Sequence, residues 1–254
     1  MKSKNPFLSN KSFAKSTTVY GVEERPADSI DYNNTMTVQG AVNKSFILLL
    51  LLIASAGYTW YMGVTGQNPL VLGIAGAVLG FISVIVASFN PKTSPYLAPA
   101  YAIFEGLFLG VISLIIQTQV NVPGIAIQAV AATFITFIIC FLLYRFGIVK
   151  VTEQFKSVVI ASTLAIATYY LISFGLSFFG VTLFHHGSSL ISIGFSVFVI
   201  IIASLNLFLD FDFIEQGAQR KLPKHMEWFG AMGLMVTLVW LYIEFLRLLS
   251  KLRD

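Results

Sequence analysis

The sequence predicts an all-α membrane protein, a bundle of seven transmembrane helices, and two observations carry this prediction. Of the 254 residues, 56% are hydrophobic and 11% are charged, whereas a soluble domain has roughly 25% charged residues. Because so few charges cannot cover a surface that faces water, lipid must be the solvent for most of the chain. The second observation is a series of seven apolar runs, each near the length of about 20 residues that a helix needs to cross the hydrocarbon core. The alternation that is typical of a β-barrel is absent.

The apolar runs define the order of the elements. They cover residues 45–62, 70–89, 97–117, 124–144, 157–179, 190–211 and 228–249. Pro and Gly in the segments between them, such as NPKTSP and NVPG, fit helix ends rather than kinks. Residues 1–44 are polar and rich in Ser, Thr and Asn, so we expect a disordered N-terminal tail over 1–44 and a seven-helix transmembrane domain over 45–252.

The basic residues predict the orientation. Thirteen of the 16 Lys and Arg residues lie in the tail and in the second, fourth and sixth loops, and the first, third and fifth loops have none. Cytosolic loops carry such an excess, so the N-terminus is expected in the cytosol. The other three, Arg247, Lys251 and Arg253, lie at the end of the last span or after it. Either they snorkel to the far headgroups, or the last helix does not cross completely.

Small residues indicate which helix faces pack. Gly76 and Gly80 lie one turn apart, as do Gly106 and Gly110, and such pairs let helix backbones approach closely in lipid. In the last span, small and polar positions repeat along one face: Gly230, Gly233, Thr237, Leu241 and Glu244. A helix with this face is expected to contact other helices rather than lipid.

Six acids lie within or at the ends of the spans: Glu105, Asp210, Asp212, Glu215, Glu227 and Glu244. A charge in mid-membrane costs at least about 2.5–3.5 kcal/mol on insertion scales, so such an acid is a candidate for function. The structural alternative is an acid that ties helices together. Arg247 follows Glu244 by three residues and can pair with it locally, but no Lys or Arg lies near the middle of a span to neutralise Glu105 or Asp210.

Such carboxyls favour protons and hard cations. Two of them in close approach would share a proton and titrate as a coupled pair, and Ca²⁺ prefers carboxylate oxygens. We therefore expect the acids to line a gated polar path.

Several classes of protein are excluded by the residues that the chain lacks. The chain has a single cysteine, Cys140, in an apolar run, which excludes intrachain disulfides and a cysteine metal site. His185 and His186 lie in the fifth loop and His225 in the sixth, on opposite sides of the membrane, so they cannot share a zinc. There is no H-E-x-x-H or G-x-S-x-G motif, so we expect no enzyme. No span has the Lys that a retinal Schiff base needs.

The chain resembles the Bax inhibitor-1 family, and more narrowly a prokaryotic branch of it. The resemblance rests on NLFLDFDFIEQGA, on PKHMEWFGAMGLMVTLVWLYIEFLRLLSKL, on MTVQGAVNKSFILLLLLIASAGYTW and on YAIFEGLFLG, and it covers about residues 35–252. It implies a seven-helix bundle with the C-terminal helix central. It also implies a pH-sensitive calcium leak with two aspartates as the sensor.

By position, the sensor matches Asp210 in the sixth span and Glu244 in the seventh, where Glu replaces the Asp of the family. The stretch between them is several residues longer than in the family. If the extra length is helical, Glu244 lies deeper and does not meet Asp210, and Asp212, Glu215 or Glu227 would supply the partner. The family also implies a basic latch, for which Lys92 is the nearest candidate.

The sequence thus predicts a pH-sensitive calcium-leak channel in which Asp210, Glu244 and Asp212 form the gate. Glu105, Glu215 and Glu227 are candidates for the cation path, and Lys92 and Arg247 for a latch or ion-pair partner. We expect no cofactor, calcium as the permeant ion with transient contact at Asp210 and Glu244, no nucleic-acid partner, and a bacterial cell membrane as the location. A monomer would be sufficient for this function. A proton-coupled transporter and a non-conducting regulator of other membrane proteins remain the alternatives.

Overall fold

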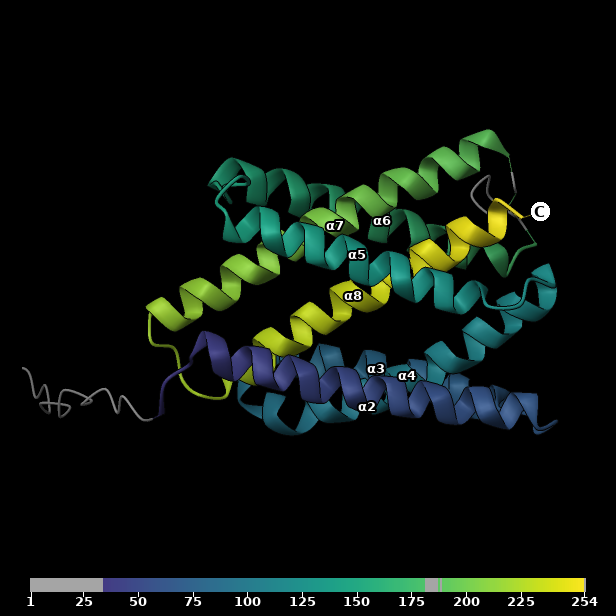
Figure 1. The fold of residues 1–254 in the computed structure, drawn as a ribbon, viewed down its shortest axis with the longest axis horizontal. Coiled ribbons are helices and arrows are strands. Elements are labelled where there is room, and N and C mark those ends of the chain that lie inside the picture. Colours follow the sequence, from purple (N-terminus) through teal and green to yellow (C-terminus); the bar gives the residue numbers. More distant parts are fainter. Residues whose placement is uncertain (1–33, 181–186, 188, 254) are drawn as a thin grey trace, which may run out of the picture. The chain divides into compact units, whose positions relative to one another are not determined.

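A computed structural model describes residues 34–180, 187 and 189–253, and Figure 1 shows the fold. Seven α-helices lie within these residues, and all are long and apolar enough to cross a membrane. They are α2 (Val38–Val64), α3 (Leu70–Phe89), α4 (Ser94–Val120), α5 (Ile125–Arg145), α6 (Glu153–Ser177), α7 (Leu190–Gln219) and α8 (Met226–Lys251), with a short 3-10 helix, η3 (Pro91–Thr93), before α4. The predicted all-helical fold is confirmed.

Helices α2 and α7 extend furthest beyond the apolar runs that predicted them. Helix α2 begins at Val38, where the Thr37 side chain accepts a hydrogen bond from the amide of Gly40, so residues 38–44 of the expected tail are helical. Residues 1–33 lie outside the described part. Helix α7 continues through the acids to Gln219. Its 30 residues span about 45 Å, which exceeds the hydrocarbon core of about 30 Å.

Helix α8 is the centre of the bundle. It packs against α2, α4, α5 and α7, and in Figure 1 it runs between a group of α2, α3 and α4 and a group of α5, α6 and α7. Helix α3 packs on α4, and α6 on α7. The central position predicted for the C-terminal helix is confirmed, and the stripe from Gly230 to Glu244 is the reason that neighbours can approach it.

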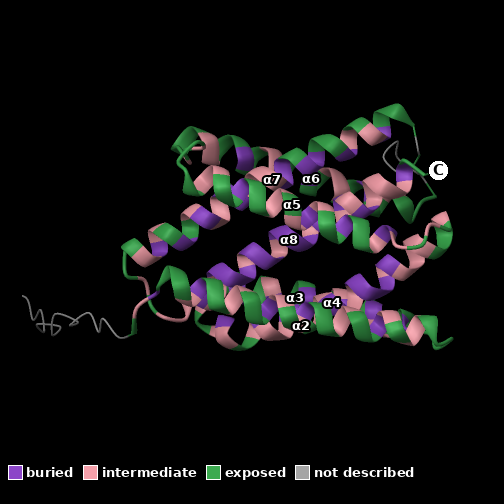
Figure 2. Ribbon diagram, in the orientation of Figure 1, coloured by how far each residue is buried: buried purple, intermediate pink, exposed green. Residues whose placement is uncertain are grey.

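The outer surface of the bundle is apolar. Figure 2 shows exposed residues along the outward faces of the helices and buried residues along α8. Phe81, Leu171 and Ile191, among many others, are large hydrophobic residues with exposed side chains. Because these faces belong to helices of membrane-spanning length, lipid is the solvent that they meet.

The two ends of the bundle differ in charge. Residues 90–93, 146–152 and 220–225 form the loops of one end, which we call the basic end because Lys92, Lys150 and Arg220 lie there. Residues 65–69 and 121–124 and the C-terminus form the far end.

Helices α2 and α4 approach closely at the predicted glycines. A Cβ on Gly106 would lie 2.3 Å from the carbonyl oxygen of Leu52, and one on Gly110 would lie 2.3 Å from that of Ala56. Gly76 is equally close to the backbone of Phe104. These contacts leave no room for a side chain, so the backbones themselves form the interface.

We expect Gly106→Ala to lower the unfolding free energy by about 1 kcal/mol or more. The clash with the α2 backbone outweighs the gain of about 1 kcal/mol in helix propensity. The matched control is Gly175→Ala in α6, where a Cβ would meet nothing within 4 Å. Chemical denaturation in mixed micelles measures both, and a Gly106→Ala protein as stable as the control would contradict close backbone packing.

Candidate functional site

Asp210 lies on α7 and faces α8. Its Oδ1 is 3.7 Å from the position that a Cβ of Gly233 would occupy, and the Thr237 side chain interacts with it. Its Oδ2 is buried and has no hydrogen-bond partner among the described residues. The contact with Gly233 is thus an ordinary van der Waals contact between α7 and α8. No Lys or Arg among the described residues forms an ion pair with Asp210, so this acid can hold a proton or meet a passing cation.

Glu244 lies on the other half of α8 and has fixed partners. Its Oε1 accepts hydrogen bonds from the hydroxyl of Tyr170 on α6 and from Arg247, both at 2.9 Å. Arg247 also donates to the Tyr170 hydroxyl at 3.0 Å and stacks over its ring at 5.2 Å. The local Glu244–Arg247 pair expected from the sequence is present. Only 1% of Glu244 is exposed, and its Oε2 is buried without a partner in the described part of the chain.

The structure does not bring Asp210 and Glu244 together. The pairing of the two helices is fixed near the far end, where the end of α8 lies beside the start of α7. There Lys251 of α8 donates to the backbone carbonyl of Ser192 at 3.2 Å and to the hydroxyl of Ser196 at 2.8 Å, both on α7. Gly233 lies opposite Asp210, and Glu244 is eleven residues further along α8. At 1.5 Å per residue this separation is about 16 Å.

The physical reason is the unequal helical length on the two sides of the turn between α7 and α8. Helix α7 ends nine residues after Asp210, at Gln219, whereas Glu244 lies 18 residues after the start of α8 at Met226. The shared-proton pair expected from the family pattern is therefore not formed in this structure.

Asp212 and Glu215 lie nearer the basic end, and both are paired. Lys156 of α6 forms an ion pair with Asp212 at 3.1 Å, and Gln216 donates to the same carboxylate at 2.6 Å. Tyr144 of α5 donates to the exposed Glu215. Asp212 and Lys156 line a pocket of about 230 Å³, together with Gln216, Arg220 and several apolar side chains.

Glu227 is fully buried at the start of α8 and is the most heavily bonded acid. Its Oε1 accepts hydrogen bonds from the amide and hydroxyl of Thr37, at 2.9 and 2.8 Å, and pairs with Lys224 at 2.9 Å. Lys44 of α2 forms an ion pair with its Oε2. This network, which we call the Glu227 clamp (Thr37, Lys44, Lys224 and Glu227), joins the first turns of α2 to those of α8.

Glu105 and Lys92 lie apart from the other candidates. Glu105 is half-buried on α4 and faces α3, where its Oε2 is 2.8 Å from the place of a Cβ on Gly80. Lys92 is exposed in η3. Neither has a hydrogen bond or ion pair within the described residues, so this structure shows no latch between Lys92 and an acid. His185 and His186 lie outside the described residues.

The acids therefore stand singly along the helices. Within the residues that the structure describes, no three His, Cys, Asp or Glu side chains gather in a way that could hold a metal. A resident Ca²⁺ takes six to eight oxygens, which a single carboxylate does not provide. The chemistry that this arrangement supports is proton exchange and transient cation contact.

Sequence reasoning missed two partners. Tyr170 follows Tyr169 in an apolar span, and nothing in its local pattern distinguishes it from a core or interfacial aromatic. Lys44 was counted as a charge of the tail, although its opposite charge, Glu227, opens another helix. One signal could have revealed the Glu227 clamp. An acid and a base lie at the starts of two helices on the same side of the membrane, where they can form a pair.

Comparison with known proteins agrees with the fold. A search of curated proteins finds no match to this chain. The model of one protein family, described as Bax inhibitor 1 like, matches residues 5–254. The match covers nearly the whole chain, including all seven helices and the acids of α4, α7 and α8. The chain is thus an integral membrane protein that belongs to the Bax inhibitor 1 like family.

Proposed function

We propose that this protein is a proton-sensitive calcium leak, as the family resemblance implies, and that Asp210 is its sensor. The observation that carries the proposal is the buried Oδ2 of Asp210 at the contact between α7 and α8, with no hydrogen-bond partner in the described residues. A carboxyl in such surroundings is sensitive to protons because its charged form lacks the solvation that water or a cation would supply.

The two acids that the family pattern pairs take different roles in this proposal. Glu244 has Arg247 as a cationic neighbour, so its charge is compensated whether the path is open or closed. Asp210 has none among the described residues, so its charge changes the balance between α7 and α8. Asp212, with Lys156 in the pocket of the basic end, is the entry point for cations, and Glu105 is a separate acid that the path does not use.

The solvation of the Asp210 carboxyl determines whether the calcium leak rises or falls with pH. A protonated Asp210 is neutral and tolerates the dry contact with Gly233, which favours the closed state. Loss of the proton leaves a buried charge with no cationic partner among the described residues, and separation of α7 from α8 relieves this cost by admitting water or a cation. Ca²⁺ would meet one carboxylate at a time and pass through rather than stay. The leak should therefore rise with pH.

Reconstitution into liposomes tests the proposal. Calcium influx through the purified protein should increase as the pH rises through neutrality, and Asp210→Asn, which cannot lose a proton, should flatten this response at the low level. The matched control is Glu215→Gln, an exposed acid on the same helix, which should keep the response of the parent protein. An unchanged pH profile in Asp210→Asn removes Asp210 from the mechanism.

The same measurement separates the other functions. Uptake against a calcium gradient that is driven by a proton gradient would identify a coupled transporter. Purified protein that passes no calcium at any pH would identify a non-conducting regulator of other membrane proteins. We also infer that the basic end faces the cytosol of a bacterial cell, because the Lys and Arg residues of the second, fourth and sixth loops lie there and such an excess is typical of cytosolic loops.

A further inference from the structure

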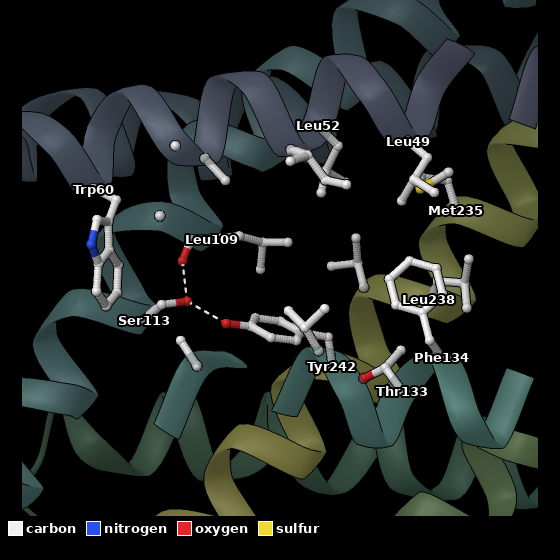
Figure 3. Close-up of a pocket in the computed structure, with 17 residues that line it drawn as sticks. Leu49, Leu52, Trp60, Leu109, Ser113, Thr133, Phe134, Met235, Leu238 and Tyr242 are labelled. Atoms are coloured by element: carbon white, nitrogen blue, oxygen red, sulfur yellow. Dashed lines mark hydrogen bonds between the residues drawn. The ribbon is translucent and has the colours of Figure 1, made fainter. Parts of the chain in front are cut away.

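A groove lies between α2, α4, α5 and α8, and none of the acids discussed above lines it (Figure 3). Its volume is about 270 Å³, and its lining is almost wholly apolar. Side chains from all four helices surround it, among them Leu49, Leu52, Trp60, Leu109, Phe134 and Leu238. The groove is thus a feature of the folded bundle rather than of one helix.

The groove opens sideways between α2 and α5. Both helices pack against α8, but they barely contact each other. Ile53 of α2 and Val130 of α5 line the groove and are 52% and 41% exposed. Gly57, also in the lining, has nothing within 4 Å of the place where its Cβ would lie. The opening therefore faces the lipid around the protein.

The groove offers water few polar partners, the main free one among the described residues being the indole N–H of Trp60 at one end. The hydroxyl groups of its lining are already engaged: Ser113 bonds the carbonyl of Leu109 at 2.5 Å and the hydroxyl of Tyr242 at 2.6 Å. Thr133 donates to the carbonyl of Ala129 at 2.8 Å. No charged side chain is among the described residues that line it. A buried water needs two to four polar partners, so neither water nor an ion is a suitable occupant.

The dimensions of the groove match one leaflet of a bilayer. Leu49 and Trp60 mark its two ends along α2 (Figure 3), and eleven residues of helix span about 16 Å. This is about half of a hydrocarbon core of about 30 Å. Trp60 lies one turn before the end of α2 at the far end, and Trp side chains favour the level of the lipid headgroups. The groove thus runs from the headgroups of the far leaflet towards mid-membrane.

We propose that this groove binds one acyl chain of a phospholipid from the leaflet at the far end. Hydrocarbon is the solvent at the opening, and the apolar lining gains nothing from a polar ligand. A helix of a second copy does not fit, because a helix 10–12 Å across and 16 Å long occupies more than about 1,000 Å³. The bound chain closes the gap between α2 and α5 and supports both against α8. This inference does not depend on calcium conduction.

The test measures the phospholipid that stays with the protein. Native mass spectrometry of thoroughly washed protein should show a single retained phospholipid, and titration with added phosphatidylglycerol should restore it after full delipidation. Gly57→Trp fills the opening and should weaken this binding at least about tenfold. The matched control is Gly175→Trp on α6, which also has open space at its Cβ but lies outside the groove, and it should bind as the parent protein does.

A second variant keeps the test decisive if Gly57→Trp fails to fold. Val130→Trp closes the groove from the α5 side and should have the same effect as Gly57→Trp. Retention of phospholipid by both variants at the level of Gly175→Trp would overturn the proposal, as would a parent protein that retains none. If the two variants abolish self-association and leave lipid binding intact, the groove is instead a contact between copies of the chain, and the proposal fails.

Discussion

Glu227→Leu is expected to lower the unfolding free energy by about 3 kcal/mol or more. Glu227 is fully buried, and the side chain of its partner Lys44 is 16% exposed. Removal of one member of a buried ion pair leaves the other charge in low-dielectric surroundings, at a cost of about 3–5 kcal/mol. The variant also leaves the amide of Thr37 without its acceptor. Chemical denaturation in mixed micelles measures the loss.

A double-mutant cycle separates the ion pair from simple loss of packing. Lys44→Met combined with Glu227→Leu removes both charges, so the double variant should be more stable than Glu227→Leu alone. The control is Glu153→Gln, which breaks the pair of Glu153 with Lys156; Glu153 is 90% exposed, and the loss should stay below about 0.5 kcal/mol. Equal losses for Glu227→Leu and Glu153→Gln would contradict a clamp at the start of α2.

The clamp also has a consequence for the opening of the bundle. It holds the first turn of α2 to α8, and the amide of Met36 donates to the carbonyl of Leu222 in the loop after α7 at 2.6 Å. Movement of α7 away from α8 at Asp210 must therefore bend this loop or release it. Glu227 on this view restrains the proposed gate without lying on the ion path.

The fold was predictable because its signals are local. Seven apolar runs of sufficient length define seven helices, since each backbone must satisfy its own hydrogen bonds in lipid. Gly106 and Gly110 marked the close approach to α2 because only small residues permit it. The boundaries were less accurate. Polar residues continue the helices beyond the hydrocarbon, as at Val38–Lys44 and at the end of α7. Hydropathy alone does not predict helical structure outside the membrane.

The site was predictable only in part, because contacts between helices depend on register. The sequence identified Asp210 and Glu244 as acids within spans, and the i to i+3 spacing identified Arg247 as a partner. Whether Asp210 meets Glu244 depends on how far α7 continues beyond Asp210 and on where α8 begins. Each added helical residue moves Glu244 about 1.5 Å along the pair. Tyr170 was unpredictable for a related reason, since its role requires α6 to lie beside Glu244.

The second large loss of stability is expected for Arg247→Met, because Arg247 is the cationic partner of the buried Glu244. Glu244 would keep the hydroxyl of Tyr170 but lose its cationic partner, and Met retains most of the apolar length of the side chain. A buried carboxylate without a charged partner is costly, although Arg247 is itself 37% exposed, so we expect a loss of about 2–3 kcal/mol in the unfolding free energy. Denaturation in mixed micelles, on the same scale as for Glu227→Leu, gives the value.

Two further variants determine whether Glu244 is an anchor or a sensor. Glu244→Gln removes the charge and keeps a hydrogen bond to Tyr170, so Arg247→Met with Glu244→Gln should recover much of the stability that Arg247→Met loses. Because Arg247 compensates Glu244 in the structure, Glu244→Gln should change stability but leave the pH dependence of calcium flux in place, unlike Asp210→Asn. A flattened pH response in Glu244→Gln would show that both acids take part in the gate. The separation of about 16 Å between them would then have to close when the protein changes state.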